Sequence, residues 1–377
     1  MCYEELLVTE NQKIDYNVMA SNIKQTRVAI LMDMPLYPYR IYAYNELVKR
    51  GYELTVISVS NKVEQYEIPL LFEHRVLSYE RTGPFVVVNE FHIRDFEKYD
   101  LIIIPSNFRM LNYYQFLRPR FWSKTIRWGH LTGRTNGNKF AEKFRFRFFK
   151  CFPALIFYEA TTRDVYLAHG FDPSKLFVAN NTQYVDPQTI HPFEERKYFL
   201  YVGRIQERKG LDIALRSFAR IKKQTDDPTL EFVVVGGGDC DKLRSIVQEE
   251  GITDAVRFVG PEHDQAKLGD WFSHALAYVS PGHVGLGVLH SFACGVPVIT
   301  CSGRLHSVEF SNCKSDNSLV VPYTVEDVEK AMESLYSNKD LQSAMSKSAY
   351  QYYNDYCTID KMVDGIDNAL QYMLHQK

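Results

Sequence analysis

The sequence lacks the signals that would place it outside the cell or across a membrane. Its seven cysteines are scattered and include no Cys-x-x-Cys pair, which argues against structural zinc and for a reducing compartment. No apolar run approaches the length of a membrane span, and Glu4, Glu5 and Glu10 stand where a secretory signal would be basic. We therefore expect a cytoplasmic protein that is soluble or held peripherally at the inner face of the plasma membrane.

The chain also has little net charge, but its basic residues are unevenly distributed. The formal net charge is -2, yet residues 109 to 150 hold eleven basic side chains against the single acidic Glu142. Local clusters matter because charges act over short distances. The eleven are Arg109, Arg118, Arg120, Lys124, Arg127, Arg134, Lys139, Lys143, Arg145, Arg147 and Lys150.

Aromatic residues alternate with these charges over residues 140–152. A helix here would have a basic side and an aromatic side, which favours contact of Lys143, Arg145, Arg147 and Lys150 with an anionic membrane or an acceptor. An ordinary helix that packs its aromatics inward is an equal alternative. Nucleic acid is not a predicted partner, because no zinc finger, RNA-recognition signature or helix-turn-helix pattern accompanies the charge.

Strands and helices alternate along the chain, which predicts an α/β protein with two doubly wound, Rossmann-like domains facing each other across a cleft. With 377 residues, 45% of them hydrophobic, the chain is long enough for two cores. Strands are expected at 27–32, 54–59, 101–105, 125–129 and 154–157, and again at 198–202, 230–235, 255–259, 275–279 and 296–300. The predicted parts are an extension (1–26), a first domain (27–186), a linker (187–197), a second domain (198–350) and a C-terminal helix returning toward the first domain (351–377).

Residues 280–300 have the order strand end, glycine loop, short helix, turn and strand. Gly282, Gly285 and Gly287 allow the backbone to approach a ligand closely, and the helix they precede directs free N–H groups toward it. This order is typical of a phosphate site. An ordinary turn between a strand and a helix is the commoner explanation of such a loop taken alone.

Four motifs in the same order resemble the donor domain of the GT-B glycosyltransferases, closest to the retaining family 4. They are Tyr-Val-Gly-Arg-Ile-Gln-Glu-Arg-Lys-Gly at 201–210, Val-Val-Gly-Gly-Gly-Asp at 234–239, Val-Arg-Phe-Val-Gly at 256–260, and the segment 280–300. The resemblance implies a GT-B fold with an acceptor-side first domain and a second domain that binds a nucleotide sugar. It also implies that no metal and no cofactor beyond the donor is needed.

The resemblance assigns roles to individual residues, which we treat as expectations. Arg204 and Lys209, with backbone N–H groups around 285–288, would hold a diphosphate whose charge grows in the transition state. His130, which directly follows the strand at 125–129, would contact the donor sugar or the leaving phosphate. Arg40 would hold an anionic part of donor or acceptor. The alternatives are exposed harmless charges for Arg204 and Lys209, a structural role for His130, and an Arg40 that starts a helix and points to water. The remaining expected donor contacts are Gly203, Gly237, Phe258, Val259, Gly282, His283, Val284, Gly285, Leu286, Gly287, His290 and Glu309.

The sequence departs from family 4 where two glutamates usually stand eight positions apart. Gly282 and His290 occupy these positions. An imidazole hydrogen-bonds a ribose hydroxyl, so His290 is expected to keep the second role. Gly282 has no side chain and cannot take the role of a carboxylate. The candidates for contact with the sugar are therefore His283, a backbone amide or Glu309.

The predicted function is a retaining transfer of a hexose-type sugar from a UDP- or GDP-sugar to a hydroxyl of a glycan. The acceptor is expected to be a lipid-linked precursor of bacterial surface polysaccharide, such as O-antigen, capsule or exopolysaccharide. No nucleophilic carboxylate is evident, which favours a front-face route with the leaving phosphate as base. Two alternatives stay open: a degenerate GT-B subunit that binds a nucleotide without catalysis, and a GT-B sugar-nucleotide epimerase.

Overall fold

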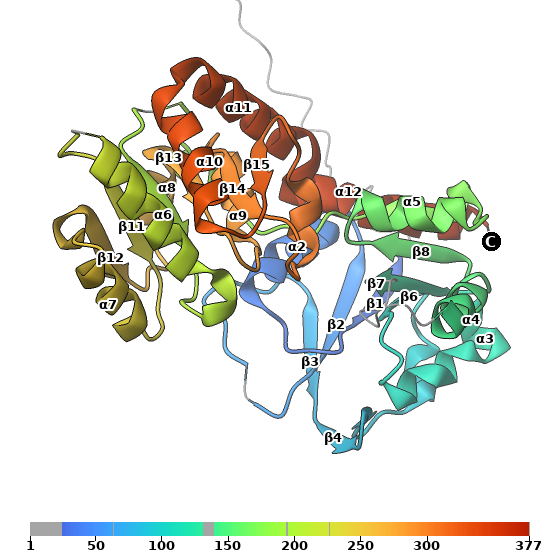
Figure 1. The fold of residues 1–377 in the computed structure, drawn as a ribbon. Helices are drawn as coiled ribbons and strands as arrows, with labels where there is room; N and C mark the ends of the chain where they lie inside the picture. Colours follow the sequence, from blue (N-terminus) through green and yellow to red (C-terminus); the bar gives the residue numbers. More distant parts are fainter. Residues whose placement is uncertain (1–24, 63, 131–138, 194, 226, 377) are drawn as a thin grey trace, which may run out of the picture.

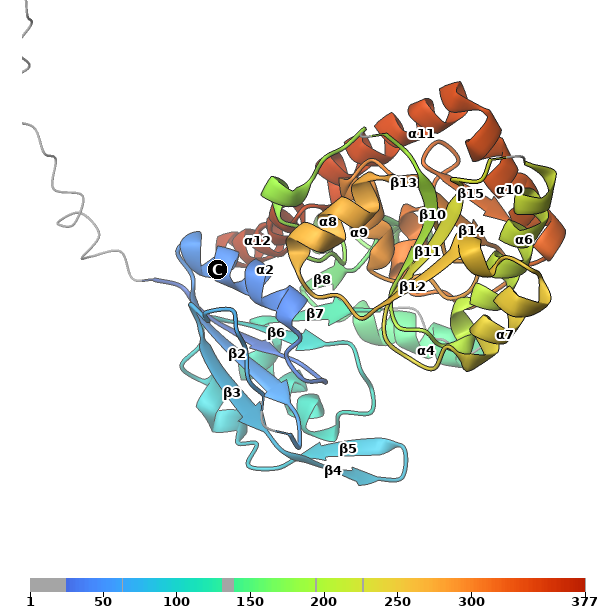
Figure 2. The same cartoon turned by 90° about the vertical axis from the view of Figure 1, so that its left-hand side faces the viewer.

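The computed structural model describes residues 25–62, 64–130, 139–193, 195–225 and 227–376. They form two lobes, each built on a parallel sheet covered by helices (Figures 1 and 2). The α/β class and the two doubly wound domains predicted from the sequence are confirmed. The predicted extension 1–26 lies almost wholly outside the described residues.

The N-terminal lobe contains a seven-stranded parallel sheet in the order β3-β2-β1-β6-β7-β8-β9. Its central strands are short apolar runs buried on both faces, as expected of a sheet with helices on each side. The strands are β1 (Arg27–Leu31), β2 (Glu53–Val59), β3 (Glu73–Leu77), β6 (Leu101–Pro105), β7 (Thr125–Gly129), β8 (Ala154–Phe157) and β9 (Leu176–Val178), and the hairpin β4 (Tyr79–Thr82) and β5 (Phe85–Val88) lies beside this sheet.

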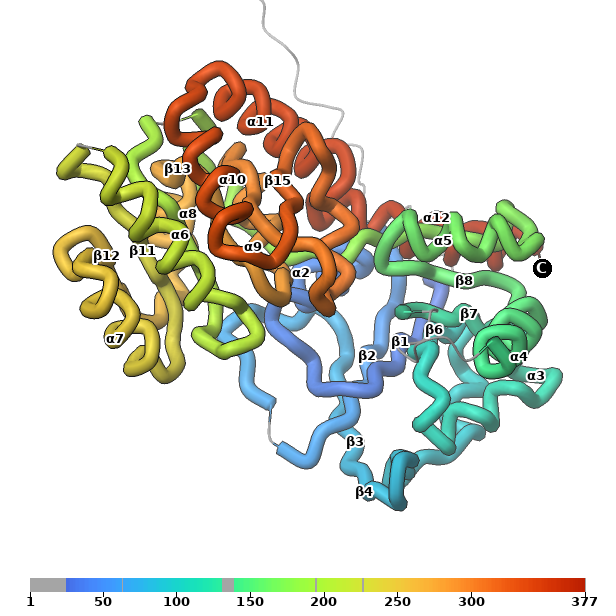
Figure 3. The backbone as a smooth tube through the Cα atoms, in the orientation of Figure 1, coloured from blue at the N-terminus to red at the C-terminus, as the bar shows by residue number. Residues whose placement is uncertain are grey.

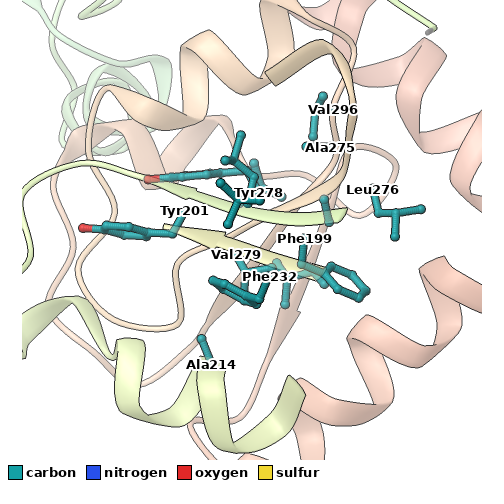
Figure 4. Close-up of a cluster of buried hydrophobic side chains, with 14 of the residues drawn as sticks. Phe199, Tyr201, Ala214, Phe232, Ala275, Leu276, Tyr278, Val279 and Val296 are labelled. Carbon is teal, nitrogen blue, oxygen red and sulfur yellow. The ribbon is translucent and has the colours of Figure 1, made fainter. Parts of the chain in front are cut away.

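The C-terminal lobe contains a six-stranded parallel sheet in the order β12-β11-β10-β13-β14-β15. Figure 4 shows its core, where Phe199, Phe232 and Val279 pack between the sheet and a helix. Tyr201 and Tyr278 stack with their ring centroids 6.1 Å apart, and their hydroxyls point the same way (Figure 4). The strands are β10 (Tyr198–Val202), β11 (Glu231–Val235), β12 (Val256–Gly260), β13 (Ala275–Val279), β14 (Val298–Cys301) and β15 (Ser318–Val321).

The two lobes share the last helix of the chain. Figure 3 shows α12 (Ile359–His375) leaving the C-terminal lobe and running back beside β8. Its apolar side, including Met362, Ile366 and Leu370, is fully buried in the core of the N-terminal lobe. The other helices used below are α2 (Pro38–Lys49), α4 (Lys139–Phe149), α5 (Ala160–Ala168), α6 (Leu211–Gln224), α8 (Gln265–Ser273), α9 (Gly287–Ala293) and the short 3-10 helix η7 (Val308–Asn312).

Candidate functional site

A cleft of about 1140 Å³ lies between the two lobes. Its N-terminal wall contains the residues that end or follow β1, β6, β7 and β8, so the carboxyl ends of these strands face the cleft. Its opposite wall is the segment 304–311, which follows β14. Ligands of doubly wound sheets bind at this edge, which makes the cleft the candidate site.

Gly282 brings the glycine loop against the turn that holds Lys209. The Gly282 N–H donates to the Lys209 carbonyl at 2.9 Å, and the His283 N–H donates to the Arg208 carbonyl at 2.8 Å. A Cβ atom at position 282 would lie 2.2 Å from the Arg208 oxygen. No side chain fits there, so the glycine where family 4 has a glutamate is required by packing, and the predicted donor contact at Gly282 is limited to its backbone.

Lys209 lies beside the glycine loop, where the sequence predicted a diphosphate contact. Its Nζ donates to the His283 carbonyl at 2.7 Å and lies next to Gly285. Burial, and then the neighbouring Arg208 guanidinium, lower the pKa of Lys209 to about 8. Within the part of the chain that the structure describes, the N–H groups of Gly285 and Leu286 have no hydrogen-bond partner. An ammonium and two free N–H donors are therefore gathered at one place.

Arg204 remains exposed, and the described residues give its guanidinium no ion pair. It is close enough to Lys209 to contribute to the lowered pKa of that ammonium.

Two glycines near these residues, Gly203 and Gly287, lie close to tyrosine hydroxyls. A Cβ atom added at Gly203 would lie 3.2 Å from the Tyr201 hydroxyl oxygen. At Gly287 the corresponding distance to Tyr278 is 2.6 Å, so this glycine also serves close packing.

His306 connects the glycine loop to the wall of the cleft. The Val284 N–H donates to His306 Nδ1 at 3.3 Å, and His306 Nε2 lies 2.7 Å from the Cys301 carbonyl. A carbonyl only accepts and Nδ1 accepts from Val284, so the ring is neutral with its proton on Nε2. Burial also lowers the pKa of His306, which favours this neutral form. The Val284 N–H is thus already occupied and is not free for the donor contact that the sequence predicted.

Glu309 lies in the cleft wall and contacts the N-terminal lobe. Its side chain is 3% exposed and accepts hydrogen bonds from Asn181 and from the Ser307 hydroxyl. Asn181 also accepts a hydrogen bond from Arg40 Nη2 at 2.6 Å. The alternative that Arg40 points to water is wrong, because the side chain is buried among aromatic rings. Sequence reasoning missed Asn181, because the short strand that precedes it was not predicted and no recognised motif contains this residue.

The histidines predicted for the site lie in different surroundings. His130 is exposed at the end of β7, lines the cleft and has its ring 5.0 Å from that of Tyr158. His290 is 3% exposed and stacks on Phe272 with the centroids 4.5 Å apart. Burial lowers the pKa of His290 to about 4. A ribose hydroxyl reaches His290 only if this side chain turns out of the core, which differs from the expected arrangement.

Four other predicted donor contacts do not line the cleft. His283 is half-buried between the loop and the turn, and burial, then Lys209, lower its pKa. Gly237 has room for a Cβ, with Pro261 3.6 Å away. Phe258 and Val259 lie in β12, the edge strand of the sheet, where Arg244 covers the Phe258 ring at 4.7 Å.

Some of the basic residues between 109 and 150 are buried or bound to the backbone rather than exposed on the surface. Arg127 is 4% exposed and its guanidinium lies 4.6 Å from the centre of the Phe152 ring, while Lys124 donates to three backbone carbonyls. Arg145 lines the cleft, so it belongs with the candidate site. Arg134 lies outside the described residues.

Helix α4 has both an inner and an outer aromatic face, so only part of its aromatic side packs inward. Phe149 is buried, and Phe146 packs on Tyr166 and Phe171. By contrast, Phe140 is 87% exposed and Phe144 61%. The charges beside these two rings, Lys143, Arg147 and Lys150, are exposed.

Comparison with known proteins decides what the C-terminal lobe is. Residues 185–352 match the family model of the glycosyl transferases group 1. The chain has the GT-B fold and carries a group 1 glycosyl transferase domain. This domain contains the turn with Arg204 and Lys209, the glycine loop and Glu309.

Curated relatives of the group 1 domain are named D-inositol 3-phosphate glycosyltransferase. The protein from Streptosporangium roseum is 37% identical over 129 residues, which are 31% of this chain and 28% of the relative. The second such protein from Catenulispora acidiphila is 31% identical over 154 residues, 35% of each chain. The match thus spans about a third of the length of these relatives.

Solved structures with the same fold cover both lobes. A glycosyltransferase from Rickettsia africae has a TM-score of 0.68 at 12% identity, covering 94% of this chain and 100% of its own. Sucrose-phosphate synthase from Thermosynechococcus elongatus has 0.65 at 16%, with 94% and 100% covered. HepE from Anabaena in complex with UDP has 0.65 at 10%, with 92% and 99% covered. At these identities the likeness establishes the fold.

Among the helices that the structure describes, none is long and apolar enough to cross a bilayer. The described histidine, cysteine and acidic side chains include no group of three placed to hold a metal ion.

Proposed function

We propose that the protein transfers a sugar from a UDP- or GDP-sugar to a hydroxyl group, with retention of configuration. The observation that carries the proposal is the position of Lys209: its ammonium lies beside two free backbone donors of the glycine loop, within a group 1 glycosyl transferase domain. Lys209 is half-buried and, among the described residues, has no salt bridge, although the Glu309 carboxylate is close enough to raise its pKa. Removing a cation from water without a paired anion is unfavourable. A diphosphate at this place would compensate the charge.

The proposed chemistry assigns the two cations to the leaving group. Breaking the bond between the sugar and the diphosphate increases negative charge on the phosphate, and Lys209 and Arg204 stabilise that charge. His130 contacts the sugar or the phosphate from the N-terminal wall of the cleft, and Glu309 contacts the sugar from the opposite wall. Fixed cations and backbone donors take the place of a metal. Retention rests on the family 4 resemblance, with the leaving phosphate removing the proton of the acceptor hydroxyl.

We propose an acceptor that carries a phosphate. Arg109 and Arg145 line the N-terminal side of the cleft, and among the described residues neither has an ion pair. Guanidinium groups bind phosphate through paired hydrogen bonds. The names of the curated relatives, which specify an inositol phosphate, agree with this chemistry. The chain's own acceptor is proposed to be a lipid-linked glycan precursor of bacterial surface polysaccharide.

The lipid half of this proposal rests on the outer face of α4. Exposed Phe140 and Phe144 stand among Lys143, Arg147 and Lys150, a combination suited to the surface of an anionic bilayer. Arg145 on the same helix lines the cleft. A membrane under α4 would therefore bring a lipid-linked acceptor close to the site, with the protein held peripherally at the cytoplasmic face.

Donor consumption tests the proposal and separates it from the two alternatives. Purified protein is incubated with UDP- and GDP-sugars, with and without a lipid phosphate glycan, and release of the nucleotide is followed. Release that rises with acceptor supports the transferase. Binding of a nucleotide without turnover would support the degenerate subunit instead. Conversion of one nucleotide sugar into another without acceptor would support an epimerase.

A further inference from the structure

We propose that Asn181 is a positioning residue that orients Glu309 in the cleft and makes this orientation depend on contact between the two lobes. The inference rests on the proposed function, because it concerns the carboxylate assigned to the sugar. Asn181 follows β9 and belongs to the N-terminal lobe: its N–H donates to the Tyr158 carbonyl at 3.0 Å. Glu309 belongs to η7 in the C-terminal lobe.

The orientation of the Asn181 amide is set by its two neighbours. The Arg40 guanidinium can only donate hydrogen bonds, and it lies 2.6 Å from Asn181 Oδ1. The Glu309 carboxylate can only accept when ionised, and Asn181 Nδ2 donates to its Oε1. The amide therefore connects a cation to an anion with donor and acceptor matched at both ends. Reversing it would place like groups together at each contact.

Arg40 is held firmly enough to fix this amide. It is 5% exposed, and its guanidinium carbon lies 5.0 Å from the ring centres of Trp128 and Tyr158. Its Nη1 contacts the Met362 sulfur at 3.4 Å, so α12 also packs on it. Among the described residues Arg40 has no carboxylate partner, and the Asn181 amide is the group that carries its hydrogen bonding toward Glu309.

The second oxygen of Glu309 is held from its own lobe. The Ser307 hydroxyl donates to Oε2, and the same hydroxyl lies 2.9 Å from the Val284 carbonyl of the glycine loop. One hydroxyl proton serves two acceptors, so this contact alone holds the carboxylate weakly. Asn181 supplies the donor that fixes the other oxygen. Without it, Glu309 would keep its place in the wall but lose its orientation toward the cleft.

The test compares Asn181→Asp and Asn181→Ala with Asn180→Asp. Asn180 is the matched control, because its side chain donates to the Tyr356 carbonyl and does not contact Glu309. The aspartate introduced at 181 keeps the acceptor for Arg40 and replaces the donor to Glu309 by a second carboxylate. We expect both substitutions at 181 to lower kcat by about tenfold to a hundredfold while donor KM changes less than about threefold.

A pH profile distinguishes positioning from a general structural defect. Arg40 beside position 181 and the more distant Lys209 favour the ionised form of this pair. Two facing carboxylates nevertheless hold one proton more readily than either alone, and that proton restores the missing hydrogen bond. In Asn181→Asp the loss of kcat should therefore shrink as pH falls from about 7.5 to 5.5, whereas in Asn181→Ala it should not. Equal losses at every pH, or wild-type kcat in both variants, would overturn the proposal.

A measurement without turnover keeps this test separate from the proposed function. Thermal unfolding is recorded for Asn181→Ala, Glu309→Gln and the double variant. Coupling predicts a combined shift in Tm smaller than the sum of the single shifts, even if no nucleotide sugar is consumed. Additive shifts would contradict the contact between Asn181 and Glu309. Failure of the donor assay with coupled shifts would overturn only the transferase.

Discussion

The ammonium of Lys209 lies 2.7 Å from the His283 carbonyl, so the turn that follows β10 is anchored to the glycine loop. The backbone N–H groups of Gly282 and His283 in the loop also donate to carbonyls of the same turn. The cation and the free N–H groups of the loop are thus held together before any ligand binds. Such preorganised donors stabilise developing charge without rearrangement.

Removal of either proposed phosphate cation should slow turnover. We expect Lys209→Ala or Arg204→Ala to lower kcat/KM for the nucleotide sugar by about a hundredfold, because each loses a charge-assisted contact to the leaving group. Lys223→Ala is the control, since Lys223 is exposed and pairs with Glu250 on another face. Activity like that of the wild type in both site variants would remove the diphosphate assignment.

The lowered pKa of Lys209 makes nucleotide binding sensitive to alkaline pH. With a pKa of about 8 in the free protein, Lys209 is mostly charged at pH 7 and mostly neutral at pH 9. A diphosphate binds the charged form, so affinity for UDP or GDP should fall by up to about tenfold between these values. Calorimetric titration of UDP or GDP at pH 7 and at pH 9 measures this change in affinity. In Lys209→Arg this decrease should vanish, because arginine stays charged; persistence of the decrease would assign it to another group.

Buried His290 should make the fold less stable in acid. Its folded pKa of about 4 lies below the ordinary value of 6.5, so the unfolded chain binds the proton more readily. Stability is complete above about pH 6.5 and is lost as pH falls from there toward 4. Between pH 7 and pH 5 the loss is about 2 kcal/mol. Denaturant unfolding of the wild type and His290→Gln should show that the variant loses less, while exposed His263→Gln behaves like the wild type.

The packing at Gly282 predicts a strong effect of a single methyl group. Gly282→Ala places a Cβ 2.2 Å from the Arg208 carbonyl and must separate the loop from the turn, whereas Gly237→Ala meets its nearest atom at 3.6 Å. We expect Gly282→Ala to lower the free energy of unfolding by about 1–3 kcal/mol and to weaken nucleotide binding. Gly237→Ala should stay within about 1 kcal/mol of the wild type. Equal stability of the two variants would contradict this packing.

The outer face of α4 should bind anionic vesicles. Replacing Phe144 by Ser and Lys143 and Arg147 by Glu removes an exposed ring and reverses two exposed charges, while Arg145, which lines the cleft, is kept. Sedimentation with phosphatidylglycerol vesicles should be lost, and donor hydrolysis in solution retained. The charge-matched control replaces Lys223 and Lys347 by Glu, because both lysines are exposed in the C-terminal lobe. Unchanged sedimentation of the α4 variant would leave only the packing role.

Much of the fold follows from local patterns in the sequence. Strands β6, β7 and β8 lie where apolar runs predicted them, because buried parallel strands are apolar on both faces. Strand β3 was missed because none of the residues of Glu73–Leu77 is fully buried and three of the five are exposed. Strands β9 and β15 have three and four residues, too few for a clear period.

The site was predictable where motifs carry it and unpredictable where distant residues meet. Lys209 and the glycine loop follow from their motifs, and their contact is a property of adjacent strands. The contact of Arg40, Asn181 and Glu309 joins three parts of the chain, separated by 141 and 128 residues, so no local pattern contains it. Likewise, nothing in the sequence indicated that His290 would stack on Phe272 in the core.

Binding of a nucleoside diphosphate tests the central claim most directly. Calorimetric titration of UDP and GDP into the wild type, Lys209→Ala and Lys223→Ala requires neither an acceptor nor knowledge of the sugar. We predict that the wild type and Lys223→Ala bind one of the two nucleotides with equal affinity, and that Lys209→Ala binds it at least about tenfold more weakly. No binding of either nucleotide by the wild type, or unchanged affinity in Lys209→Ala, would contradict a diphosphate site at the glycine loop.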